Sequence, residues 1–167
     1  PEGANTGAYM TRGWCFTEAC WAAMTKDFDF SLDLGKLTGD ETTKLEIIAA
    51  CTEGGGRLPP LTPDEFEREI ESKTFTNGKD DKPLVSRLYR AAFSEQFGKA
   101  GALFYDELGW GDAEAAQLAK VIASGVLANL KVLNLIDNNI GDAGCSALAD
   151  AITGGALAEP QPSAAAA

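Results

Sequence analysis

The chain has 167 residues, of which 45% are hydrophobic, and its formal net charge is −11 with no histidine. An acidic surface repels the phosphates of nucleic acids and of anionic lipids, so the expected partner is a neutral or basic protein. No apolar run approaches the roughly 20 residues that a membrane-spanning helix needs, and the length allows one domain with a sizeable core.

The four cysteines, Cys15, Cys20, Cys51 and Cys145, show no C-x-x-C spacing. Without a histidine they cannot complete a mixed zinc site. The pattern predicts reduced, partly buried thiols, which are typical of an intracellular, reducing compartment. We expect no metal and no cofactor.

The first predicted element is a helix over residues 12–24, RGWCFTEACWAAM. Glu18 allows two interpretations: a catalytic carboxylate, or a charged residue on the outer side of a core helix. A single carboxylate seldom forms a catalytic site without a second acid, a histidine or a metal beside it. The favoured prediction is a core helix that packs Trp14, Cys15 and Trp21 inside, with Glu18 in a structural role.

The same stretch resembles the W-C-x-x-E segment of Toll/interleukin-1-receptor (TIR)-like domains, in which an aromatic–cysteine pair precedes a helix carrying a glutamate. Trp14, Cys15 and Glu18 match that motif. The resemblance implies a flavodoxin-like fold with parallel strands. As an alternative function, it implies cleavage of NAD with Glu18 as the catalytic residue.

The next segments predict a mixture of strand and helix. Residues 28–34 alternate apolar and polar side chains, the period of a half-buried strand, and residues 45–51 favour a short helix. A further helix begins after Thr62, because Pro63 suits the first helical position and Glu65 completes a capping box.

A turn at residues 77–78 precedes an amphipathic helix over residues 83–97, for which Asp81 is the predicted cap. We expect this helix to pack on the repeat that follows and to cover its open end. Its apolar stripe consists of Val85, Leu88, Tyr89, Ala92, Phe93 and Phe97.

The C-terminal third contains an internal repeat. The stretch from Ala102 aligns without a gap, at an offset of 30 residues, with the stretch from Val132. In the second copy Asp142 is a plausible N-cap of a helix. The matching pairs are Leu103 with Leu133, Tyr105 with Leu135, Trp110 with Ile140, Leu118 with Leu148 and Ile122 with Ile152.

The second copy reads L-x-x-L-x-L-x-x-N-x-I from Leu130 to Ile140 and resembles the leucine-rich repeat, of the long helical type found in ribonuclease inhibitor. The resemblance implies that Leu133 and Leu135 point inward from a short strand. It also implies that Asn138 turns the chain and satisfies backbone groups of the next turn.

In such repeats alternate strand residues face outward. The candidate partner-binding residues are therefore Phe104, Asp106, Asn134 and Ile136. Phe104 and Ile136 are unusual for a surface in water, which favours a stripe that binds a partner. The alternative is that the N-terminal part of the same chain covers them.

The predicted fold class is α/β: an incomplete N-terminal α/β segment packed on the first two units of a leucine-rich repeat solenoid. The expected organisation is a helix-rich segment over residues 1–99 that ends a longer domain, two repeat units over 100–158, and a low-complexity tail over 159–167. The succession of motifs along most of the chain also resembles large proteins of unicellular algae.

These observations favour a protein–protein interaction module or accessory scaffold subunit without catalysis of its own. One alternative is a structural subunit of a larger assembly, which in an alga could be a photosystem–antenna complex. The other is the NAD-cleaving enzyme that the TIR-like segment implies. The sequence does not identify the partner, the compartment or the oligomeric state.

Overall fold

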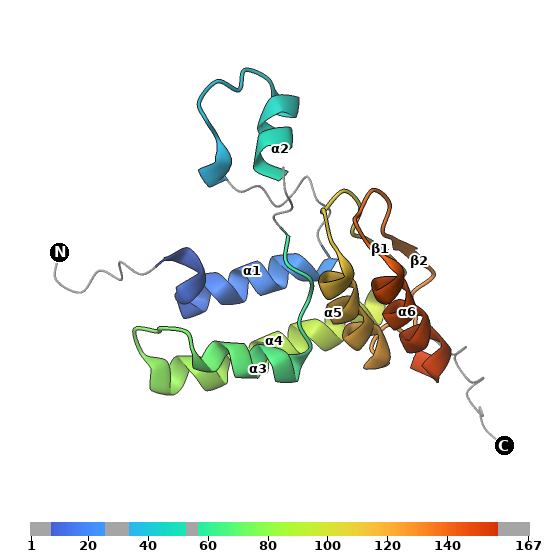
Figure 1. Ribbon diagram of the computed structural model, residues 1–167. Helices are drawn as coiled ribbons and strands as arrows, with labels where there is room; N and C mark the ends of the chain where they lie inside the picture. The colour runs from blue at the N-terminus through green and yellow to red at the C-terminus, as the bar shows by residue number, and fades with distance from the viewer. Residues whose placement is uncertain (1–7, 26–33, 53–56, 157–167) are drawn as a thin grey trace.

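A computed structural model describes residues 8–25, 34–52 and 57–156 (Figure 1). Helices predominate, and the two strands are short. The elements in chain order are the 3₁₀ helix η1 (Tyr9–Thr11), α1 (Gly13–Thr25), the 3₁₀ helix η3 (Leu34–Lys36), α2 (Lys44–Thr52), α3 (Pro63–Glu71), α4 (Gly78–Lys99), β1 (Ala102–Phe104), α5 (Asp112–Ala123), β2 (Val132–Asn134), α6 (Asp142–Ala151) and the π-helical turn η4 (Ile152–Ala156).

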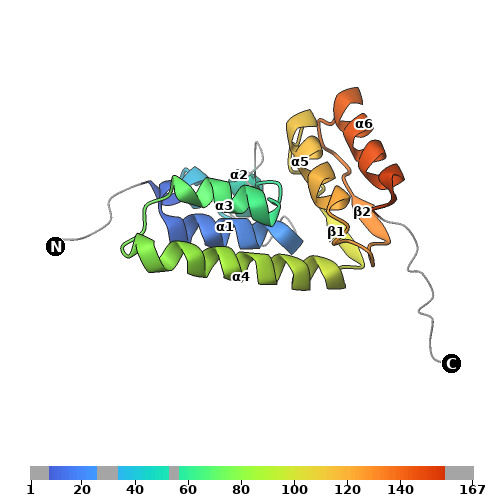
Figure 2. The same cartoon turned by 90° about the horizontal axis from the view of Figure 1, so that it is seen from below.

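Helices α1, α3 and α4 form a helical body, in which α4 packs against both of the others (Figure 2). Its centre is a stack of aromatic rings. The centroids of Phe66 and Tyr89 are 3.9 Å apart, and those of Phe16 and Phe66 are 5.8 Å apart. Each ring comes from a different helix, so burial of the stack holds the three helices together.

The start of α3 confirms the predicted capping box. The Thr62 hydroxyl accepts a hydrogen bond from the backbone of Glu65, whose carboxylate accepts one from the backbone of Thr62. Helix α4, by contrast, begins before the predicted residue 83. The amides of Asp80 and Asp81 donate to the carbonyl of Asn77, so Asp81 lies inside the first turns rather than capping them.

The predicted stripe of α4 is inward at four positions, Val85, Tyr89, Phe93 and Phe97, which are at most 3% exposed. Leu88, which was predicted in the stripe, is 38% exposed. The main helical partners of α4 are α1 and α3. The stripe thus contributes to the core of the helical body, and α4 also approaches the repeat, where Asn129 donates to the carbonyl of Gly98.

The predicted inward face of α1 is wrong for Trp14 and is confirmed in part for Trp21, which packs against the core. Trp14 is 40% exposed, and Cys15 and Trp21 are half-buried. The Trp14 indole instead contacts the edge of Phe75 and donates to a carboxylate oxygen of Asp81. The residues that face inward recur at helical spacing: Phe16, Cys20, Ala23 and Met24.

The internal repeat folds into two strand–helix units, β1–α5 and β2–α6. The strands pair in parallel, with Leu103 opposite Leu133, so the repeat offset in sequence is the register of the sheet. The helices approach closely at Gly144, where a Cβ atom would lie 2.7 Å from Asp112 Oδ1 and 2.9 Å from the Cβ of Ala115. Glycine is therefore required at this contact.

The predicted fold class is nevertheless wrong. The described residues are mainly helical, the one sheet among them has two parallel strands, and two strand–helix units form no solenoid. The physical reason is that residues 63–99 place their apolar side chains at helical spacing into an aromatic core of their own. Helix–helix contacts therefore organise this region, and no described strand extends the sheet into it.

Two further predictions concern the segment drawn at the top of Figure 1. The helix predicted over residues 45–51 is present as α2. The strand predicted over residues 28–34 falls outside the described residues except for Leu34, which begins η3. The predicted tail over residues 159–167 also lies outside them.

Among the described helices, none has both the length and the apolar character needed to cross a membrane.

Candidate protein-binding surface

The side of the sheet that faces away from α5 and α6 carries the predicted partner-binding stripe, here called the outer sheet face. Phe104 on β1 is 45% exposed, Val132 on β2 is 49% exposed, and Ile136 just after β2 is 66% exposed. Strand alternation puts residues 102 and 104 on the same side as residues 132 and 134. Large apolar side chains are thus exposed from both strands.

Polar groups link the two strands on the same face. Asn134 Nδ2 donates to Asp106 Oδ1 at 3.0 Å, and Asn134 Oδ1 accepts from the backbone amide of Ile136 at 3.1 Å. The predicted residues Asp106 and Asn134 are therefore brought together. Their mutual hydrogen bond fixes the strand ends and leaves Phe104 and Ile136 as the apolar contact points.

The end of the face that follows the strands is acidic. Glu107 and Asp137 occupy equivalent positions of the two units, both in the left-handed region with φ of 56° and 55°. Both are exposed, and the half-buried Asp106 directly precedes Glu107 in the chain. Lys131 is the last lysine or arginine in the sequence, and it precedes β2, at the strand end opposite these carboxylates. Carboxylates at one end favour a partner with basic groups there.

Beneath the face lies a buried arginine that the sequence analysis did not identify. Arg57 is 6% exposed, and its guanidinium donates to the carbonyls of Ala23 and Phe104, each at 3.0 Å. It also lies 4.5 Å from the ring centroid of Tyr105, whose hydroxyl donates to the carbonyl of Met24. Burial raises the pKa of the Tyr105 hydroxyl, which therefore stays protonated.

This arrangement joins the helical body to the sheet. The carbonyls of Ala23 and Met24 belong to the last turn of α1, where carbonyl groups lack helical partners and a positive charge is favourable. Because Arg57 also binds the carbonyl of Phe104, β1 is held directly to the end of α1. The outer sheet face therefore rests on a rigid support.

As predicted, the side chain of Asn138 forms hydrogen bonds with backbone groups. These groups lie in the preceding unit and in its own unit, rather than in a following turn. Its Oδ1 accepts from the backbone amide of Trp110, and its Nδ2 donates to the carbonyls of Tyr105 and Leu135. Asp142, predicted as an N-cap, is the first residue of α6. The capping acceptor comes instead from Asp112 Oδ1, which binds the amides of Gly141 and Gly144.

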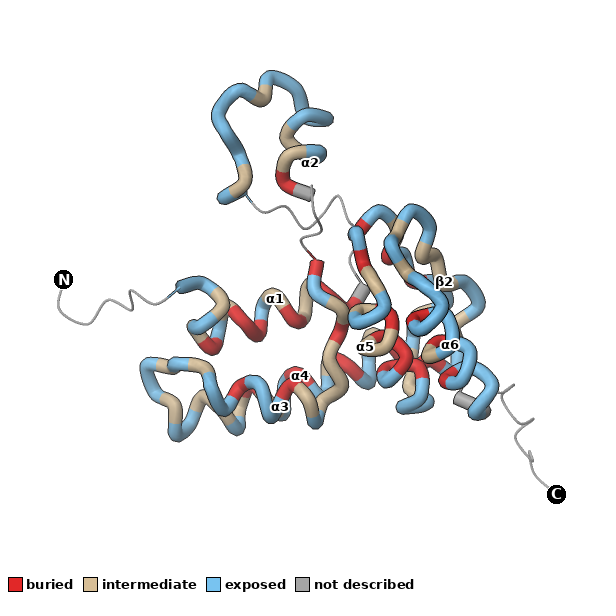
Figure 3. Tube along the Cα trace, in the orientation of Figure 1, coloured by how far each residue is buried: buried red, intermediate tan, exposed pale blue. Residues whose placement is uncertain are grey.

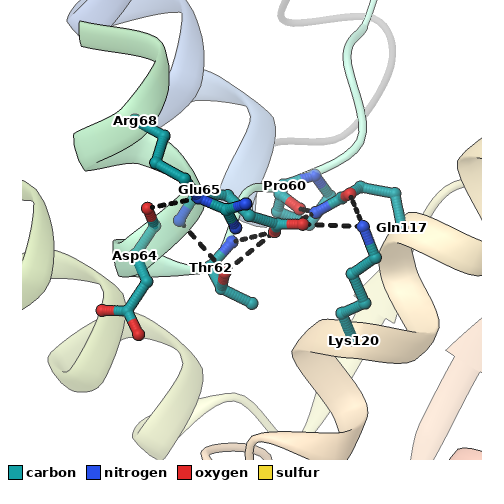
Figure 4. A network of polar contacts seen from close by, with 7 residues as sticks. All are labelled: Pro60, Thr62, Asp64, Glu65, Arg68, Gln117 and Lys120. Carbon is teal, nitrogen blue, oxygen red and sulfur yellow. Dashed lines mark hydrogen bonds and ion pairs between the residues drawn. The ribbon is translucent and has the colours of Figure 1, made fainter. Parts of the chain in front are cut away.

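A second joint connects α3 with α5 (Figure 4). One Glu65 carboxylate oxygen accepts from Gln117 at 2.6 Å, and the other accepts from Lys120 at 2.7 Å. Burial raises the pKa of Glu65, but the hydrogen bonds from Lys120, Gln117 and Thr62 together outweigh it and bring the pKa to about 2. This carboxylate therefore stays charged and bonded over the whole neutral range.

The remaining candidate, Glu18, is exposed on α1, on the side away from the aromatic stack. Among the described residues, no group of three or more cysteine, aspartate or glutamate side chains could hold a metal ion. The four cysteines are unpaired; Cys20 and Cys51 are buried, and burial raises the pKa of Cys20 to about 12. The outer sheet face is the arrangement that the candidate residues build together.

Comparison of the chain with models of protein families, with curated proteins and with solved structures found no match. The predicted membership in the leucine-rich repeat family is accordingly wrong, as is the TIR-like assignment of residues 14–18, and the likeness to algal proteins gains no support. The mainly helical fold agrees with this outcome. Function must therefore be inferred from the geometry of this chain.

Proposed function

We propose that this chain is a protein-binding module that recognises its partner through the outer sheet face and uses no cofactor. The observation that carries the proposal is the exposure of three large apolar side chains: Phe104 and Val132 on one small sheet, and Ile136 in the turn that follows it. Apolar groups gathered on a surface and bordered by polar groups are typical of interaction sites.

The chemistry of the face restricts its partner. The chain carries a net charge of −11, and Asp106, Glu107 and Asp137 lie at the end of the apolar stripe. A partner with an apolar centre and basic groups at one side would match both features, whereas an acidic partner would be repelled. The proposed partner is accordingly a neutral or basic protein.

The experiment compares two variants that replace exposed apolar side chains by serine on different surfaces. Affinity capture with the tagged chain from its native cells is quantified by mass spectrometry for the wild type, for Phe104→Ser with Ile136→Ser, and for a control variant. Leu88→Ser is the control, because Leu88 is 38% exposed on α4, away from the sheet. Proteins lost by the double variant and retained by the control are then purified.

We expect a purified partner to bind the double variant at least about tenfold more weakly than the control, as measured by calorimetry, because removal of central apolar anchors is costly. Thermal unfolding checks that both variants remain folded. Equal affinity for both variants would contradict the proposed face. Unfolding of the double variant would show instead that the stripe belongs to the core.

A further inference from the structure

Residues 34–52, here called the arm, stand apart from the helical body and from the two strand–helix units (Figure 1). The arm consists of η3, α2 and the residues between them, and η3 and α2 contact each other. Among the described residues, the hydrophobic core and the apolar side chains packed against it include none from the arm. Figure 3 shows most of the arm as exposed. The packing of the core therefore does not determine where the arm lies.

Hydrogen bonds within the arm give it a defined local structure. The Glu46 carboxylate accepts from the backbone amides of Thr42 and Thr43 at 2.7 and 3.0 Å, and the Thr43 hydroxyl accepts from the amide of Glu46 at 3.2 Å. This is a capping box at the start of α2. The Glu41 carboxylate accepts from the amide of Thr38, and bonds of this kind lower the pKa of Glu41 to about 2. The arm can therefore dock as a preformed unit.

The arm exposes large apolar side chains. Leu34 is 65% exposed, Leu37 is 36% exposed and Leu45 is 77% exposed. Contact between these side chains and the outer sheet face would remove two apolar surfaces from water, which is favourable. The sequence already allowed that the N-terminal part of the chain covers Phe104 and Ile136, and the arm is the part with the apolar side chains to do so.

The path of the chain brings the arm within reach of the outer sheet face. Arg57, which follows the arm, donates to the carbonyl of Phe104 and also to the carbonyl of Ala23, which precedes the arm. Both connections of the arm therefore begin close to β1. Thr52, the last residue of α2, is five positions before Arg57, and five residues span at most about 18 Å. The arm can thus reach the outer sheet face while the helical body stays as it is.

The charges favour one orientation of the arm. Lys44 begins α2 and is exposed next to Leu45, whereas Glu107 and Asp137 make one end of the outer sheet face acidic. With Leu45 on the apolar stripe, Lys44 can face that acidic end, and opposite charges attract. The arm as a whole contains two lysines and three acidic residues. The apolar contact therefore stabilises the docked arm, and Lys44 determines its direction.

We propose that the arm docks on the outer sheet face of its own chain, with Leu45 against Phe104 and Ile136, and that the protein partner has to displace it. The arrangement in Figure 1 is then the undocked state, in which the face is free. A short connection within one chain gives a high effective concentration, which favours this contact over one between two copies. The competition rests on the proposed function, whereas the docked arm itself is detectable without any partner.

The first test is methyl NMR of the full 167-residue chain. Nuclear Overhauser contacts are expected between the methyl groups of Leu45 and those of Val132 or Ile136. Dilution should leave these contacts unchanged, because a contact within one chain does not depend on concentration.

The second test compares matched serine variants by the same method. Leu37→Ser with Leu45→Ser should shift the methyl signals of Val132 and Ile136, because the arm no longer covers them. Leu88→Ser is the control, since Leu88 lies on α4 and should leave those signals in place. The backbone signals of residues 44–52 check that α2 stays helical, as expected because Leu45 is exposed.

The third test measures competition with a partner purified from the capture experiment. The variant with Leu37→Ser and Leu45→Ser should bind that partner at least about threefold more tightly than the Leu88→Ser control, as measured by calorimetry. The physical reason is that the apparent affinity rises with the fraction of molecules in which the face is free. The variant with Phe104→Ser and Ile136→Ser should lose both the docked arm and the partner.

Three results would overturn the inference. If the Leu45 contacts are absent and the signals of Val132 and Ile136 are the same in wild type and arm variant, the arm does not dock, and the proposed partner surface is unaffected. Contacts that disappear on dilution would assign the arm to a second copy of the chain. A partner that binds the arm variant and the Leu88→Ser control equally would exclude the competition.

Discussion

The two strand–helix units follow the same sequence pattern and are nevertheless buried to different extents. Leu103 and Tyr105 in the first unit are 1% and 0% exposed, whereas Leu133 and Leu135 at the equivalent positions of the second are half-buried. The first unit lies between the helical body and the second unit (Figure 1). A repeat pattern therefore specifies which side chains point inward, and their neighbours determine how completely they are buried.

The helices show the same contrast. Asp112 and Ala115 on α5 face α6, where Asp112 binds two amides and Ala115 is fully buried. The equivalent residues on α6, Asp142 and Cys145, are both exposed. The second unit thus presents to solvent the surface that the first unit uses for packing, and this difference can be measured by matched substitutions.

The largest difference is expected for the inward leucines of the strands. Leu103→Ala should lower the free energy of unfolding by about 2–5 kcal/mol, the range for a fully buried leucine. Leu133→Ala should cost less, about 1–2 kcal/mol, because its side chain already contacts water and less apolar area is lost. Urea denaturation of the two variants measures both values.

Equal losses for the two variants would break the comparison. They would show that Leu133 is as completely buried in solution as Leu103.

Much of the local structure could be predicted because it depends on nearby residues. The capping box of Thr62 and Glu65, the inward positions of α4 and the register of the repeat all follow from short-range spacing. The exposed positions of Phe104 and Ile136 follow from strand alternation. In each case the signal is a periodic pattern or a fixed offset, which a sequence displays directly.

The joints between distant segments could not be predicted. Arg57 lies in no element that the sequence predicted, yet it binds the carbonyls of Ala23 and Phe104, which are 34 residues before it and 47 residues after it. Trp14 was expected inside because it is large and apolar, but Phe16 and Cys20 take the inward face of α1. Which face of a helix is buried depends on partners that a single sequence does not reveal. The predicted fold class was wrong because residues 63–99 form a helical aromatic core of their own, into which no described strand extends.

A second prediction concerns the polar contact between α3 and α5, which α6 does not repeat among the described residues. Gln117 and Lys120 on α5 bind Glu65, whereas the equivalent residues on α6 are Ala147 and Asp150. Glu65→Gln should lower the free energy of unfolding at pH 7 by roughly 1–2 kcal/mol. The full pKa shift would give a larger value, but Lys120 is 57% exposed and solvent screens the pair.

The effect of Glu65→Gln should depend on pH. The pKa of Glu65 is lowered from 4.5 to about 2 in the folded chain, so its charge stabilises the fold above pH 4.5. This contribution is lost as the pH falls from 4.5 toward 2, and the difference between wild type and variant should disappear over that interval. Glu95→Gln is the control, because Glu95 pairs with Lys99 at the same 2.7 Å on an exposed surface and should show no measurable effect.

The smallest expected effect is the difference in stability between variants of two equivalent aspartates, Asp112 on α5 and Asp142 on α6. Asp112→Ala should cost about 1 kcal/mol, since it leaves the amides of Gly141 and Gly144 without their acceptor at the start of α6. Asp142→Ala should change stability by less than about 0.5 kcal/mol, as expected for an exposed position that supports no following unit. Thermal unfolding of both variants measures this difference. If Asp142→Ala proved as costly as Asp112→Ala, the side chain of Asp142 would have a capping role like that of Asp112, and the contrast between the two units would lie in the strands alone.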